Sequence, residues 1–127
     1  MLGILLVDHG SRRAEANAQL DDMAARVTRL LPPGTPLATA HLDVCAPTIA
    51  DGIAALLARG CDDLRVLLYF LSDGRHVRED IPGLVRAALA AHPQVRWSMG
   101  GALGPDDMLA QLMLTRAGLG NAECWNA

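Results

Sequence analysis

Aromatic residues are scarce in this sequence, which contains one Phe, one Tyr and two Trp among 127 residues. Hydrophobic residues nevertheless make up 51% of the chain, so the core must consist mainly of aliphatic side chains and alanine. A chain of this length typically forms one domain. We therefore expect residues 1–127 to form a single α/β domain, in which residues 118–127 are a loosely ordered tail because they show no clear periodicity.

A strong excess of either charge is also absent. The chain has 11 Lys and Arg against 14 Asp and Glu, for a net charge of −3. Nucleic-acid-binding domains usually carry a basic patch, so neither nucleic acid nor a membrane surface is an expected partner. No apolar run approaches the ~20 residues that span a bilayer. The N-terminal run MLGILLV is short, lacks a basic residue and leads directly into Asp8, which indicates a buried strand and not a signal peptide.

Cysteines are few, and no C-x-x-C pair is present. The three cysteines are Cys45, Cys61 and Cys124. Neither a disulfide framework nor a cysteine-based zinc site is expected from this odd and scattered set. The sequence therefore suits a reducing compartment, and we expect the protein in the cytoplasm.

Apolar runs and helical periodicities alternate four times along the chain. The runs are typical of strands buried on both faces, and a 3.6-residue periodicity follows each of them. The predicted strands are 2–8, 37–44, 64–71 and 95–99, and the predicted helices are about 14–31, 48–59, 79–91 and 106–117. Pro47 suits the first turn of the second helix, and Gly60 suits its C-terminal cap.

Four strand–helix units indicate a parallel sheet with right-handed crossovers and helices on both faces. We predict a flavodoxin-like fold with strand order 2-1-3-4. The direction of winding then reverses between the first and third strands. Folds of this type bind ligands outside the carboxyl ends of the strands at that reversal.

Two of the four histidines follow the strands that flank this point. His9 comes directly after the first strand, and His76 lies in the connection after the third strand. Asp43 ends the second strand, which is the other neighbour of the first. Because adjacent strands lie ~4.8 Å apart, we expect these side chains to converge on one small ligand.

Imidazole and carboxylate together have two obvious uses. They bind borderline divalent metals, and an imidazole also transfers protons near neutral pH. Gly10 and Gly74 allow a ligand to approach the backbone closely, and Arg12 and Arg75 suit carboxylates or phosphates.

Each of these residues also has an ordinary structural role. A histidine near a helix start is often solvated or a cap, Asp43 could cap the second helix, and surface arginines commonly pair with nearby acids. His41 and His92 are expected to be structural. Ser11 resembles a nucleophile, but its HGSR context lacks the G-x-S-x-G elbow.

The segments around these residues resemble the short sirohydrochlorin chelatases, the CbiX/SirB type of class II tetrapyrrole metal chelatase. The similar segments are ILLVDHGSRRAEAN (4–17), HLDVCAPTIADGI (41–53), YFLSDGRHVREDIP (69–82) and GALGPDDML (101–109). The GRHV-x-x-DIP pattern is fairly specific, whereas HGSR alone is not.

The resemblance implies that the chain inserts cobalt or iron, and possibly nickel, into sirohydrochlorin or a related tetrapyrrole, with no ATP and no cofactor other than the metal substrate. It also implies a homodimer. His9 and His76 would be the catalytic pair and would bind the metal, and Asp43 stands where the family usually has glutamate. The residues expected to contact the tetrapyrrole are Gly10, Ser11, Arg12, Gly74 and Arg75.

Two other functions stay open from the sequence. The shorter carboxylate of Asp43 leaves room for a non-catalytic carrier of tetrapyrrole or metal. A hydrolase or phosphoryl-transfer enzyme would instead use His9 or Ser11 with an arginine-held phosphate. Both histidines would accept cobalt, nickel or iron, so the sequence does not select the metal.

Overall fold

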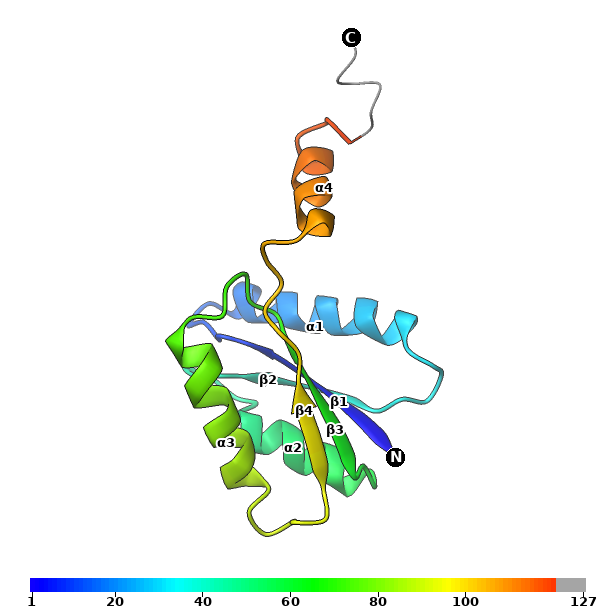
Figure 1. Ribbon diagram of the computed structural model, residues 1–127, viewed down its shortest axis with the longest axis vertical. Coiled ribbons are helices and arrows are strands. Elements are labelled where there is room, and N and C mark those ends of the chain that lie inside the picture. The colour runs from blue at the N-terminus through cyan, green and yellow to red at the C-terminus, as the bar shows by residue number, and fades with distance from the viewer. Residues whose placement is uncertain (121–127) are drawn as a thin grey trace.

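The protein is described here by a computed structural model that covers residues 1–120, apart from the side chain of His76. Strands and helices alternate as the sequence predicts (Figure 1). The strands are β1 (Leu2–Asp8), β2 (Leu37–His41), β3 (Asp63–Leu68) and β4 (Arg96–Met99). The helical elements are α1 (Ala14–Leu30), α2 (Ile49–Ala58), the π-helical turn η1 (His76–Asp80), α3 (Ile81–Ala88) and α4 (Asp107–Arg116).

The four strands form one parallel sheet in the order β2-β1-β3-β4, which confirms the predicted topology. In the register of the sheet, Leu5 of β1 lies between Ala38 of β2 and Val66 of β3. The carboxyl ends of β1 and β2 meet where Asp8 is paired with His41. The loops that carry His9 and Asp43 therefore leave the sheet side by side.

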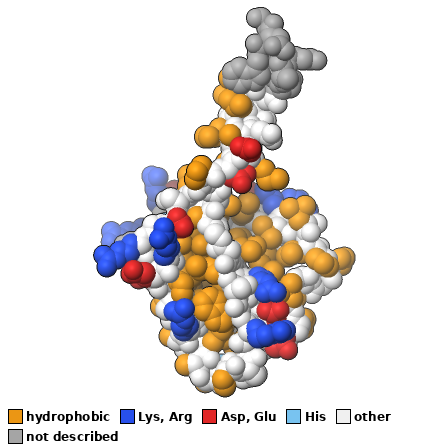
Figure 2. Space-filling view, viewed as in Figure 1, with side chains coloured by type: hydrophobic (Ala, Val, Ile, Leu, Met, Phe, Trp, Pro, Cys, Tyr) orange, Lys and Arg blue, Asp and Glu red, His pale blue; other side chains and the backbone are white. Residues whose placement is uncertain are grey.

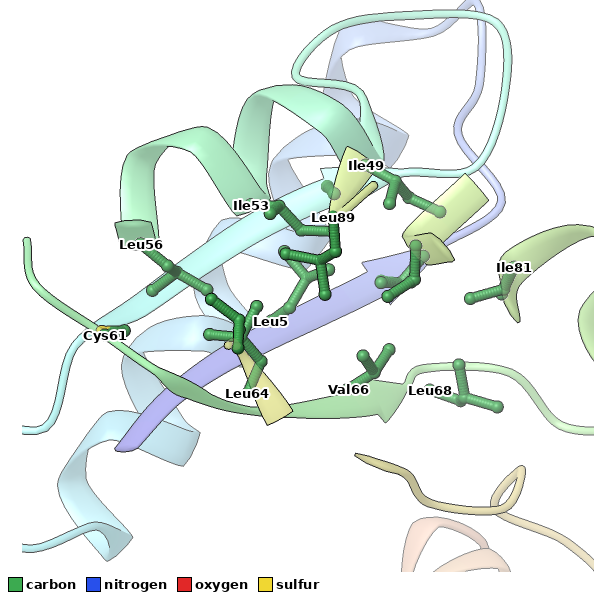
Figure 3. Close-up of a cluster of buried hydrophobic side chains, with 14 of the residues drawn as sticks. Leu5, Ile49, Ile53, Leu56, Cys61, Leu64, Val66, Leu68, Ile81 and Leu89 are labelled. Carbon is green, nitrogen blue, oxygen red and sulfur yellow. The ribbon is translucent and has the colours of Figure 1, made fainter. Parts of the chain in front are cut away.

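The main core lies between one face of the sheet and helices α2 and α3. Alternate residues of β1 and β3 point into it, and the fully buried residues are mostly leucine, isoleucine and valine (Figure 3). Ile53 and Leu56 of α2 and Ile81 of α3 lie against this face. The core is aliphatic, as the composition predicts, and its aromatic members are the buried Phe70 and the half-buried Trp97.

Helix α1 covers the opposite face of the sheet. Its Met23 and Val27 lie near Leu6 of β1 and Leu67 of β3. Since residues of a strand alternate between faces, Asp8 shares the α1 face with Leu6, whereas Val7 points into the main core.

Two predicted strands end earlier than the sequence suggests. The strand expected at 37–44 stops at His41, because the chain then folds back and the His41 N–H donates to the carbonyl of Pro47 at 2.8 Å. Val44 takes a positive φ of 77° in this turn. The strand expected at 64–71 stops at Leu68, although the Tyr69 N–H still donates to the carbonyl of Val7.

The second helix starts later than predicted. Thr48 is its N-cap and forms a capping box with Asp51, so neither Pro47 nor Asp43 fills the role expected at this end. Gly60 follows the helix with a φ of 89°, as the sequence predicts for a residue at this end.

Helix α4 departs from the layered arrangement. It extends away from the sheet instead of lying on it (Figure 1), and none of its residues is buried against the described part of the chain. No helix among the described residues is both long and apolar enough to cross a bilayer. The tail predicted at 118–127 lies mostly outside the described residues.

Candidate functional site

His9 lies at the carboxyl end of β1, on the side of the sheet that faces α3. Its side chain is exposed, and its ring meets the buried ring of Phe70 edge-on, with 4.6 Å between the centroids. The backbone carbonyl of His9 accepts the N–H of Asp43 at 3.0 Å. The β1–β2 pairing thus continues past the strand ends and holds these two residues together.

An open pocket of about 580 Å³ lies beside His9. It is lined by His9 and Asp43 from the two strand ends and by Glu79 and Asp80 from η1, with Gly83, Leu84 and Leu42 completing the wall. Three carboxyl side chains and no Lys or Arg line it. This acidic lining suits a cation, because like charges around one site attract a counter-ion, although Arg75 already pairs with Glu79 at 3.4 Å.

One carboxylate oxygen of Asp43 is engaged within its own turn. Its Oδ1 accepts the N–H of Val44 at 2.8 Å, which fixes the carboxylate in the turn. The remaining oxygen and a ring nitrogen of His9 are groups that borderline divalent metals bind. Among the described side chains, no three His, Cys, Asp or Glu residues are grouped closely enough to hold a metal ion by themselves.

The second predicted histidine begins η1. His76 is the first residue of that turn, but its side chain lies outside the described part of the structure. Its convergence with His9 therefore stays a prediction. The π-helical geometry is itself informative, because such turns occur frequently at functional sites.

Gly10 packs tightly against the neighbouring strand end. A Cβ at this position would overlap the carbonyl oxygen of Asp43 and would lie 3.0 Å from the Cβ of His41. Its φ of 89° is also unfavourable for other residues. The role that the structure gives Gly10 is close backbone approach within the protein.

Ser11 starts the turn into α1. Its backbone N–H donates to the Asn17 side chain at 2.8 Å, its carbonyl accepts from the same amide at 2.7 Å, and its Oγ accepts the N–H of Arg13. The Ser11 side chain also lines a smaller pocket of about 220 Å³ on the α1 side, which Asp8, His9 and Tyr69 share. His9 thus borders both openings.

The arginines mostly form the surface pairs that the sequence allows. Arg75 lies 3.4 Å from Glu79, and Arg78 lies 3.5 Å from Asp73. Arg12 is exposed and makes no ion pair with the described residues. Gly74 has open space around it, and its carbonyl accepts the N–H groups of Val77 and Arg78 at the start of the helical segment.

Two features of this site were missed from the sequence. Glu79 and Asp80 are not among the residues predicted for the site, yet they line the pocket with His9. Asp8 and His41 form a side-chain hydrogen bond between His41 Nδ1 and Asp8 Oδ1. The parallel pairing of β1 with β2 provides a signal for that contact, because it places the two strand ends in adjacent positions.

Known proteins with similar sequences are named as sirohydrochlorin chelatases. The chain is 31% identical over 115 residues to "Sirohydrochlorin ferrochelatase, chloroplastic" of Arabidopsis thaliana, covering 90% of this chain and 50% of the relative. It is 24% identical over 124 residues to a sirohydrochlorin cobaltochelatase of Methanococcoides burtonii, covering 91% and 94%. The chain therefore spans about half the length of some curated relatives and nearly all of another.

Solved structures share the fold. SirB from Bacillus subtilis subspecies spizizenii, a sirohydrochlorin chelatase in complex with cobalt, superposes with a TM-score of 0.85 at 25% identity, over 92% of this chain and 50% of that one. A putative cobalamin-biosynthesis CbiX protein from Marinobacter aquaeolei gives 0.78 at 21% identity, over 93% and 95%, which supports the fold alone. The CbiX family model matches residues 3–118. His9, His76 and Asp43 fall inside this match, and the chain belongs to the CbiX family.

Proposed function

We propose that this chain inserts a divalent metal ion into sirohydrochlorin or a closely related tetrapyrrole, without ATP and with no cofactor besides the metal substrate. One observation carries the proposal: His9 stands at the sheet's switch point beside an open, acid-lined pocket that also contains Asp43. The names of the similar chelatases and the structure of SirB in complex with cobalt support the same chemistry.

The reaction needs a group that binds the metal and a group that accepts protons. When M²⁺ enters the free-base macrocycle, two pyrrole N–H protons leave, and the products are the metallated macrocycle and two H⁺. A neutral imidazole performs either task near neutral pH. We assign these tasks to His9 and His76, with Asp43 as a further metal ligand.

The macrocycle carries carboxylates, which a basic rim would hold. Arg12 is exposed at the start of α1, and Arg75 lies on the loop before η1, where its ion pair with Glu79 is also exposed. Exposed ion pairs are weak, so a substrate carboxylate can replace Glu79 with little loss. Gly10, Ser11 and Gly74 lie on the same two loops and complete the proposed substrate contacts.

We further propose that the chain works as a homodimer in a reducing compartment such as the cytoplasm. Cys45 and Cys61 are free thiols, which suits reducing conditions. Some relatives are twice as long, so a second copy would supply a second domain of the same fold.

The test follows the absorbance change of sirohydrochlorin on addition of Co²⁺, Fe²⁺ or Ni²⁺, with and without protein. We expect acceleration over the spontaneous reaction, and the initial rates rank the metals. His9→Ala and His76→Ala should each lower the rate about 100-fold or more, as for loss of an acid–base group. His92→Ala is the matched control, because His92 lies in the turn after α3, at the opposite end of the sheet.

Two results would contradict the proposal. Unchanged rates in both the His9 and His76 variants would show that the reaction occurs elsewhere. Tight binding of metal or tetrapyrrole with no acceleration by the unmodified protein would instead favour a carrier, the alternative left open by the shorter carboxylate of Asp43.

A further inference from the structure

Asp8 and His41 form a buried polar pair directly behind the candidate site. His41 is 5% exposed and is the one charged or polar side chain that is buried among the described residues. The Asp8 side chain is 16% exposed, and its Oδ1 bonds His41 Nδ1. The two residues are the last paired positions of β1 and β2, so this bond joins the strand ends.

Stability alone does not explain such a pair. Removing a carboxylate and an imidazole from water has a desolvation cost, and well-packed apolar replacements of buried ionic pairs are often equally or more stable. Farther along this face of the sheet, Leu6, Met23 and Val27 are apolar, whereas Asp8 itself borders the small pocket that it shares with Ser11 and Tyr69. The polar pair therefore contributes something that packing alone would not.

The geometry around the pair shows what that contribution is. The backbone carbonyl of Asp8 accepts the Leu42 N–H at 2.8 Å, and the next rung joins His9 to Asp43. Gly10 packs onto His41, whose Cβ lies 3.0 Å from the position of a Gly10 Cβ. The Asp8–His41 side-chain bond is thus adjacent in sequence to the two backbone hydrogen bonds, Leu42 to Asp8 and Asp43 to His9, that set the separation of His9 and Asp43.

We infer that Asp8 and His41 are positioning residues that fix His9 relative to Asp43 across the pocket. This inference rests on the proposed function for its catalytic consequence, but its structural content is independent of it. The directional Nδ1–Oδ1 bond sets the register and spacing of the two strand ends. An apolar pair would fill the space without setting that spacing.

The test compares variants that keep the hydrogen bond with variants that remove it. Asp8→Asn retains the acceptor oxygen, and His41→Asn places an amide donor near the position of Nδ1. The double variant Asp8→Ala/His41→Phe keeps most of the volume and removes the bond. Asp63→Asn is the matched control, because Asp63 pairs with Arg65 at the amino end of the same sheet.

Three measurements are made on each variant: the unfolding temperature, kcat and KM for Co²⁺ insertion into sirohydrochlorin, and the NMR shifts of the His9 ring. The His9 signals are identified by their loss in His9→Gln. They report position because the edge-on contact with Phe70, at 4.6 Å, imposes a ring-current shift.

We expect the double variant to unfold at the same or a higher temperature, with kcat reduced about 10- to 100-fold, KM within about threefold, and displaced His9 signals. Both Asn variants and the Asp63 control should stay within about threefold of the unmodified protein in kcat, with His9 signals in place. A double variant with unchanged kcat and unchanged His9 signals would overturn the inference, as would Asn variants as defective as the double variant.

Two further cases keep the test decisive. If the double variant does not fold, His41→Leu and His41→Asn are compared instead. His41→Leu removes the hydrogen bond to Asp8, and His41→Asn keeps it. If the unmodified protein does not accelerate metal insertion, the proposed function fails, while the His9 signals still test the positioning. Unchanged signals in His41→Leu or in the double variant would then overturn it.

Discussion

Gly10 and Asp43 touch through their backbones: the α-carbon of Gly10 lies so close to the carbonyl oxygen of Asp43 that no side chain fits between them. The two residues follow β1 and β2, the strands whose ends form the candidate site. This contact determines how near the His9 loop approaches the Asp43 loop. A methyl group added at Gly10 would therefore displace the Asp43 loop from the His9 loop.

We predict that Gly10→Ala lowers the rate of metal insertion at least tenfold. The added methyl group forces the Asp43 loop to shift, and displacements of about 1 Å can reduce catalysis by about 10²-fold. The positive φ adds a destabilisation of about 1 kcal/mol or more. The measurement is the initial rate with Co²⁺, together with the midpoint of thermal unfolding.

Gly34→Ala is the matched control for that substitution. Gly34 has a similar φ of 85°, but a Cβ there meets nothing within 4 Å. It should lose similar stability from the backbone strain and retain the full rate. Equal losses of rate in the two variants would mean that stability, and not the separation of the loops, limits activity.

The carboxylate of Asp43 should contribute to metal affinity. Asp43→Asn keeps an oxygen for the Val44 N–H but removes the negative charge from the pocket. We expect the affinity for Co²⁺, measured by calorimetry without tetrapyrrole, to fall about tenfold, or ~1.4 kcal/mol. Asp43→Glu, which keeps the negative charge, should bind at least as tightly as the unmodified protein.

Asp22→Asn is the control for the loss of one negative charge. Asp22 lies on α1 in an exposed pair with Arg26, at 3.2 Å, away from the pocket. Its substitution should leave Co²⁺ affinity unchanged. If Asp43→Asn also binds Co²⁺ normally, Asp43 is not a metal ligand and the His9 side of the site acts without it.

The sequence predicts the sheet well because its signals are strong there. Continuous apolar runs separated by helical periodicity leave few arrangements once right-handed crossovers are required, so the strand order follows. The convergence of His9 and Asp43 follows in turn, because parallel strands end at one edge. No side-chain chemistry was needed for either prediction.

The sequence predicts the loops less well because long-range contacts decide them. The fold-back after His41 depends on its bond to the carbonyl of Pro47, and the cap of α2 moves to Thr48 as a result. In the sequence, the acidic residues of η1 look like ordinary charges at the start of a helix. In the structure, Glu79 lines the same pocket as His9. The His41–Pro47 bond spans six residues within an irregular turn, and the approach of Glu79 to His9 spans 70, so neither follows from the helix and strand periodicities of the sequence.

The apolar surface of α4 leads to the last prediction. A helix of 10 residues is marginal in water without tertiary support, yet no described contact buries any residue of α4. Met108 is 80% exposed and Met113 is 67% exposed. Figure 2 shows hydrophobic side chains on this helix and on the face of the domain beneath it.

A groove of about 600 Å³ lies where α4 leaves the domain. Its lining is mostly apolar and includes Leu71, Pro105, Leu109, Leu112 and Met113. We expect a second copy of the chain to cover this surface, because large exposed apolar patches commonly mark protein–protein interfaces and the chain spans about half the length of some relatives. Light scattering should then give twice the 13.5 kDa of one chain.

Met113→Asp should convert that dimer to a monomer, because a buried carboxylate without a partner is costly at an interface. Leu30→Asp is the control: Leu30 is 88% exposed at the end of α1, far along the chain from the groove, and its substitution should leave the dimer intact. A monomeric unmodified protein at micromolar concentration would contradict the prediction, and so would a Met113→Asp variant that stays dimeric. Metal insertion by the Met113→Asp monomer then shows whether one domain suffices: a large loss of rate with intact folding means that the second copy contributes to the macrocycle site.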